Sequence, residues 1–94
     1  MDDNQLDRSL RSIGKKCFVD YYDKFSDSRL SNADLIELLM KNEGYKESGC
    51  KTRVSQSRRI IKSGMSINAL KEILKSSKLD DSTLDKAQIL LNRL

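Results

Sequence analysis

Residues 31–63 have the sequence SNADLIELLMKNEGYKESGCKTRVSQSRRIIKS, and the expected architecture follows from its pattern. The first part predicts a helix over residues 32–43, whose leucines, isoleucine and methionine form a broad apolar face. Ser31 is a good N-cap, and Asp34 lies three residues later in an approximate capping box. Gly44 predicts the end of this helix, because glycine adopts the left-handed conformation without a Cβ penalty.

The second part of this stretch predicts a basic helix over residues 50–63, after a short loop at residues 45–49. Four side chains fall in one narrow sector at 100° per residue, and we expect them to face the core: Cys50, Val54, Ser57 and Ile61. Gly64 follows as a C-cap. Of the two helices, we expect the one over residues 32–43 to be the central and most buried element of the domain.

An apolar periodicity precedes this pair, over roughly residues 3–25. Its members recur at steps of three and four: Leu6, Leu10, Ile13, Cys17, Tyr21 and Phe25. Phe18 and Tyr22 widen the same face, and at this spacing aromatic rings are typical of a core. Gly14 lies inside the pattern, so one kinked helix and two short helices both fit.

Two further helices are expected after Gly64. The first begins with Ser66 as N-cap and ends at residues 76–77. The second begins at Ser82, and one face is predicted to hold Leu84, Ala87, Leu91 and Leu94. We therefore expect an all-α fold, with one domain over residues 1–94 built as a small bundle of about five short helices. The helix near 32–43, the loop after it and the basic helix near 50–63 together resemble a helix-turn-helix pair.

Composition excludes several classes of protein. The chain has 94 residues, no histidine and only two cysteines, so it lacks the residues for an imidazole base or a Cys/His zinc site. No apolar run approaches the ~20 residues of a membrane helix, and the polar, acidic start is unlike a signal or transit peptide. We expect a cytoplasmic protein with reduced, buried thiols, no membrane association, no cofactor or metal, and no enzymatic activity.

The positive charge is concentrated in one part of the chain. The whole sequence carries 18 Lys and Arg against 14 Asp and Glu, a net charge of +4. Residues 46–62 hold six basic residues and one acidic residue, whereas the remainder is close to neutral. This window falls mostly on the expected helix 50–63, which we expect to be free of acidic residues.

A basic helix with short polar side chains suits the major groove of DNA, because cations neutralise phosphates while amides and guanidiniums bond to base edges. The expected phosphate contacts are Lys51, Arg53, Arg58 and Lys62. The expected base contacts lie on one stripe: Thr52, Gln56 and Arg59. The sequence thus predicts a small protein that binds double-stranded DNA, as a transcriptional regulator or accessory factor. This interpretation fails if Glu37, Glu43, Glu47 and Asp85 fold across the basic helix.

Other interpretations stay open. The helix that begins at Ser66 is a second candidate reader, with Asn68, Lys71 and Lys75, but Glu72 lies in the middle of that surface. The C-terminal helix 82–94 is apolar on more than one side, which suits a homodimer, a protein-protein interaction module or an inhibitor. RNA binding ranks lower, because Tyr45 is the only aromatic residue near the basic helix.

Overall fold

One hydrophobic core of 18 buried residues receives side chains from every helix of the protein. The computed structural model describes residues 1–94 and contains seven α-helices and no strand. The helices are α1 (Asp3–Ile13), α2 (Lys15–Asp20), α3 (Tyr22–Phe25), α4 (Asn32–Glu43), α5 (Glu47–Lys62), α6 (Ser66–Leu74) and α7 (Asp81–Arg93). The predicted all-α bundle is confirmed, with the first expected helix divided into three.

The division of the first apolar pattern begins at Gly14. Its φ of +88° lies in the region that favours glycine, and its N–H donates to the Leu10 carbonyl to end α1. A second break at Tyr21 separates α2 from α3. The breaks keep the predicted apolar residues inside, since all of them are buried except Tyr21, which is half-buried.

The capping predictions for α4 are confirmed. Ser31 and Asp34 form a reciprocal capping box, in which each side chain accepts from the other residue's backbone N–H. Gly44, with a φ of +69°, ends the helix by donating to the Met40 carbonyl.

The predicted start of the basic helix is wrong by one turn. α5 begins at Glu47, so only residues 44–46 connect it to α4 and Gly49 lies inside the helix. The expectation of an acid-free helix is also wrong, because Glu47 occupies its first turn. The core side is formed by Cys50, Val54, Ser57 and Ile60, and Ile61 is only half-buried.

The starts of the last two helices also differ from the prediction. Met65, and not Ser66, holds the N-cap position of α6, and Asp80, and not Ser82, holds that of α7. The buried side of α7 is correspondingly rotated: Thr83, Ala87 and Leu90 are buried, and Leu94 is exposed.

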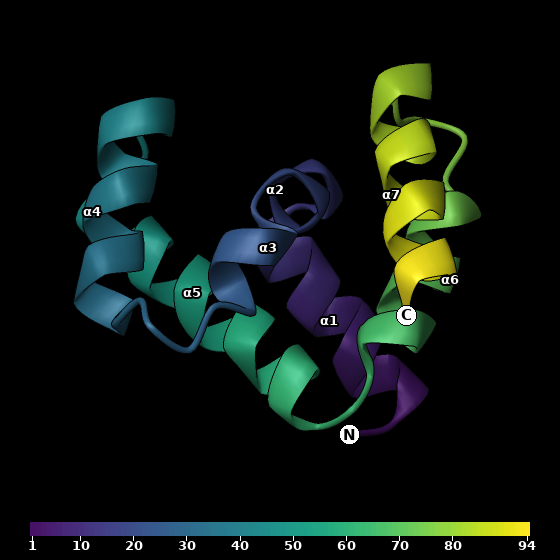
Figure 1. Cartoon of the computed structure of the whole chain (residues 1–94), viewed down its shortest axis with the longest axis horizontal. Helices are drawn as coiled ribbons and strands as arrows, with labels where there is room; N and C mark the ends of the chain where they lie inside the picture. Colours follow the sequence, from purple (N-terminus) through teal and green to yellow (C-terminus); the bar gives the residue numbers. More distant parts are fainter.

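The arrangement places α4 and α7 at opposite ends of the molecule, with α1 and α5 lying between them (Figure 1). The prediction that residues 32–43 form the central, most buried element is therefore wrong, because α4 lies at one end and buries only Leu35 and Leu39. α5 packs against α1 on one side and α4 on the other, and α7 packs against α6 and α2. None of the seven helices combines the length and the apolar character that a membrane span requires.

Candidate nucleic-acid interface

All seven residues predicted to contact DNA lie on α5, but their surroundings differ. Arg59 and Lys62 are exposed, and neither forms an ion pair. They occupy the last turn of the helix, where cations also interact favourably with the helix dipole. These two side chains are the free cations of the predicted set.

Arg58 is held by the fold. Its guanidinium donates to the backbone carbonyls of Phe25, Asp27 and Leu30 at 3.2, 3.0 and 2.6 Å. It also donates to the side-chain oxygen of Asn32 at 2.8 Å. The planar fork of arginine satisfies several acceptors at once. Arg58 therefore fastens the loop between α3 and α4, and its donors are largely consumed.

Arg53 is directed toward the start of α5. Its guanidinium carbon lies 3.9 Å above the centre of the Tyr45 ring, which is a cation–π contact. Gly49, one turn earlier, makes room for it, because a Cβ there would lie 2.8 Å from the Arg53 Nη1. The same contact covers one face of Tyr45, the only aromatic residue near the basic helix.

The N-terminal part of the predicted surface is internally paired. Lys51 forms an ion pair with Glu47 at 3.2 Å, one turn apart, and both side chains are exposed. The Thr52 hydroxyl donates to the Ser48 carbonyl at 3.2 Å. An exposed pair of this kind contributes little stability and exchanges readily with another anion.

Gln56 joins α5 to α1. The buried Ser9 hydroxyl donates to the Gln56 Oε1 at 2.8 Å, and Gln56 is half-buried. Recognition of adenine by glutamine needs this oxygen as an acceptor and the amide nitrogen as a donor. With one lone pair of the oxygen taken by Ser9, Gln56 offers a ligand its two N–H donors and a single remaining lone pair.

Two polar hollows open beside Arg59. One has a volume of about 350 Å³ and is lined by Asn32, Ser55, Arg58, Arg59, Lys62 and Ser63. The other has a volume of about 260 Å³ and lies between α1 and α5, lined by Gln5, Arg8, Ser9, Ser12, Gln56 and Arg59. Neither contains a carboxylate or an apolar residue. The basic surface thus continues from α5 onto α1.

The contribution of α1 to this surface was not predicted from the sequence. Gln5, Arg8 and Ser12 recur at steps of three and four, so they share one helix face. That periodicity was available in the sequence. The sequence does not show that α1 crosses α5. This crossing brings α1, a nearly neutral segment, beside the basic helix.

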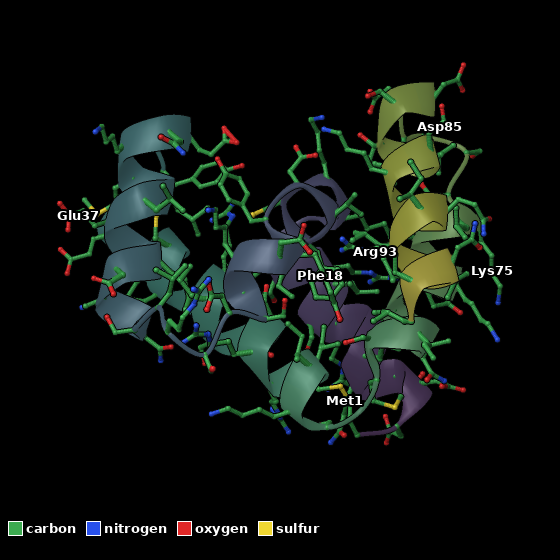
Figure 2. The ribbon with its side chains drawn as sticks, viewed as in Figure 1. Met1, Phe18, Glu37, Lys75, Asp85 and Arg93 are labelled. Atoms are coloured by element: carbon green, nitrogen blue, oxygen red, sulfur yellow. The ribbon has the colours of Figure 1, made fainter.

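Three of the four acidic residues that could mask the basic helix lie outside α5, and the fourth, Glu47, is in its first turn. Glu37 points outward from α4, away from the rest of the molecule, and Asp85 lies on α7 at the opposite end (Figure 2). Glu43 accepts a hydrogen bond from the Tyr21 hydroxyl at 3.2 Å. Only Glu47 reaches a cation of the predicted set, and that cation is Lys51.

The C-terminal helix offers no continuous apolar face. Ile89 and Leu94 are 60% and 54% exposed. At 100° per residue, they project about 140° apart around the helix. The hollow beside Ile89 is bounded by charged pairs, Lys86–Asp20 and Arg93–Asp23. Isolated exposed apolar residues are normal on protein surfaces.

Cys17 lies on α2 and Cys50 near the start of α5, and both thiols are free and buried. Burial raises the pKa of Cys17 to about 11, against a smaller opposing influence of Arg53. Burial also raises the pKa of Cys50. The structure contains no group of three or more side chains suited to hold a metal ion.

Comparison with known proteins places the chain in no group: no protein-family model, curated protein or solved structure matches it at a significant level.

Proposed function

We propose that the protein binds double-stranded DNA, mainly through backbone phosphates, with the surface formed by α5 and the adjoining face of α1. The observation that carries this proposal is the carboxylate-free pair of hollows around Arg59. Phosphate contacts by Lys and Arg supply most non-specific DNA affinity, because each one releases condensed counterions. Three exposed cations without ion pairs serve this role: Arg8, Arg59 and Lys62.

The connection between α4 and α5 supports a helix-turn-helix-like presentation. Residues 44–46 provide a turn of three residues, within the range used by that motif. In this arrangement α5 enters or lies along the major groove, and α4 supports it. Engagement of the Gln56 oxygen by Ser9 favours contacts to phosphates over bidentate contacts to bases.

The test is equilibrium binding to a fluorescein-labelled duplex of about 20 base pairs, measured by anisotropy between about 50 and 200 mM KCl. Arg59 and Lys62 are replaced together by alanine. The matched control is Lys24→Ala with Lys78→Ala, which removes the same charge from two exposed lysines that lie outside α5 and form no ion pair.

We expect the R59A/K62A variant to bind more weakly and to reduce the slope of log K against log salt by about 1–2. The control should retain the wild-type slope to within a few tenths. Circular dichroism on all three proteins checks that the helices are intact. Absence of duplex binding by the wild-type protein, or equal losses in both double variants, would overturn the proposal.

A further inference from the structure

The hollow between α1 and α5 has the chemistry of an anion site. Arg8 and Arg59 both line it, and neither forms an ion pair. Arg11, three residues after Arg8, is paired with Asp7 at 2.9 Å. Two guanidiniums without a counter-charge around one hollow repel each other, and a bound anion removes that repulsion.

The two amides of this hollow keep their N–H donors, whereas the Ser9 and Ser12 hydroxyls have already donated their hydrogens within the protein. The Gln56 Oε1 accepts from Ser9, and the Gln5 Oε1 accepts from the Asp2 backbone N–H at 3.1 Å. Both amide NH₂ groups are therefore without a partner in the protein. The Ser12 hydroxyl donates to the Arg8 carbonyl, so it is fixed on the same helix face.

We infer that this hollow seats a phosphate group of the duplex backbone, held between the Arg8 and Arg59 guanidiniums and bonded by the Gln56 amide. Guanidiniums bind phosphate oxygens through two parallel hydrogen bonds, which fixes the position of the phosphate as well as its charge. The inference rests on the proposed function and deepens it, because it assigns one phosphate to a defined seat between Arg8, Arg59 and the Gln56 amide.

Arg59 also lines the second hollow, together with Lys62. A side chain shared by two adjoining anion sites contacts two phosphates of the same strand. One strand of the duplex then passes the C-terminal end of α5, from the α1 side toward the start of α4. This path makes the α1–α5 crossing the point that sets the orientation of the protein on DNA.

The first experiment compares Arg8→Ala with Arg11→Ala in the anisotropy assay. Both variants remove one positive charge from α1, but only Arg8 lines the hollow. We expect R8A to weaken binding roughly tenfold at about 0.1 M salt and to reduce the salt slope by about 0.9, as for loss of one phosphate contact. R11A should change affinity less than twofold.

The second experiment uses Gln56→Glu, which keeps an oxygen for Ser9 and replaces the amide donor by a carboxylate. A phosphate contact predicts a loss of roughly tenfold or more that is the same for A·T-rich and G·C-rich duplexes. A base contact predicts a loss that depends on sequence. A sequence-dependent loss would overturn the assignment of Gln56 to phosphate.

The outcomes separate the inference from the proposed function. If R59A/K62A weakens binding but R8A matches R11A, the phosphate seat is wrong, and the proposed function stands with α5 alone as the DNA-binding surface. If the wild-type protein binds no duplex, both fail. In that case a titration with inorganic phosphate, monitored by the side-chain NMR signals of Gln56 and Arg8, does not rescue the inference, because the assigned ligand is a phosphate of a duplex.

Discussion

The Arg58 guanidinium lies 2.6 Å from the backbone oxygen of Leu30, a residue of the loop that joins α3 to α4. Through this bond and its other hydrogen bonds, Arg58 holds the α3–α4 loop against the basic helix. The excess positive charge of α5 is therefore divided between holding the fold and facing solvent, and Arg59 and Lys62 supply the solvent-facing part.

Replacing Arg58 should destabilise the protein more than replacing its neighbour Arg59. The Arg58→Ala change leaves three backbone carbonyls without their partner, and we expect a loss of about 2–4 kcal/mol in the free energy of unfolding. Arg58→Lys should recover only part of it, because an ammonium lacks the planar fork. Urea denaturation measures the free energy of unfolding of both variants. The control, Arg59→Ala, should lose about 1 kcal/mol or less. Equal losses at the two positions would contradict the structural role of Arg58.

Alanine substitution of two buried serines, Ser9 of α1 and Ser57 of α5, should change the stability of the fold in opposite directions. Ser9 donates to Gln56, whereas the Ser57 hydroxyl is fully buried and has no hydrogen-bond partner. Ser9→Ala should cost about 1 kcal/mol, and Ser57→Ala should be neutral or stabilising by up to about 1 kcal/mol. Thermal unfolding compares the two variants. A destabilising Ser57→Ala change would show that this hydroxyl has a partner in solution.

The effect of Gly49→Ala should depend on Arg53. Alanine is favoured over glycine in a helix interior by about 1 kcal/mol, but its Cβ displaces the Arg53 guanidinium from Tyr45. We expect little net change in the wild-type background and a gain of about 1 kcal/mol in an Arg53→Ala background. A double-mutant cycle measures this coupling. Identical effects in the two backgrounds would mean that Arg53 does not occupy the space beside Gly49.

Both thiols should resist alkylation in the native protein. Burial raises the pKa of Cys17 from 9.0 to about 11, so the thiolate population near pH 8 falls roughly 100-fold. Reaction with iodoacetamide should become fast only after unfolding in urea. The folded state holds the proton more tightly than the unfolded state, so the Cys17 contribution to stability is present below pH 9 and lost as the pH rises toward 11. Rapid native labelling at pH 8 would contradict this burial.

Acid should weaken the fold through carboxylates whose pKa is lowered. The side-chain and backbone hydrogen bonds from Arg29 lower the pKa of Asp27 from 3.8 to about 2, and hydrogen bonds from Ser31 lower that of Asp34. Their contributions are present above about pH 4 and lost as the pH falls toward 2. Urea midpoints at several acidic pH values should decline less steeply for Asp27→Asn than for the wild-type protein. Asp3→Asn, on an exposed residue of α1, serves as the control.

The sequence alone determined the helical class, the position of α4 and the location of the basic helix. These properties depend on local patterns, namely the apolar periodicity, the Ser31–Asp34 box and Gly44, and such patterns act within one or two helical turns. The start of α5 was predicted one turn late, because Gly49 resembles a loop residue until Arg53 is seen to occupy the space beside it.

Tertiary structure alone decided which cations are free and which segments share the candidate interface. Arg58 reaches carbonyls of a loop about 30 residues away in the sequence, and Ser9 meets Gln56 across an even longer separation. Contacts at such separations leave no periodic trace in the chain, because they depend on how helices cross and not on their own turns. The helix that carries the charge was therefore predictable, whereas the polar hollow beside Arg8 exists only where α1 lies against α5.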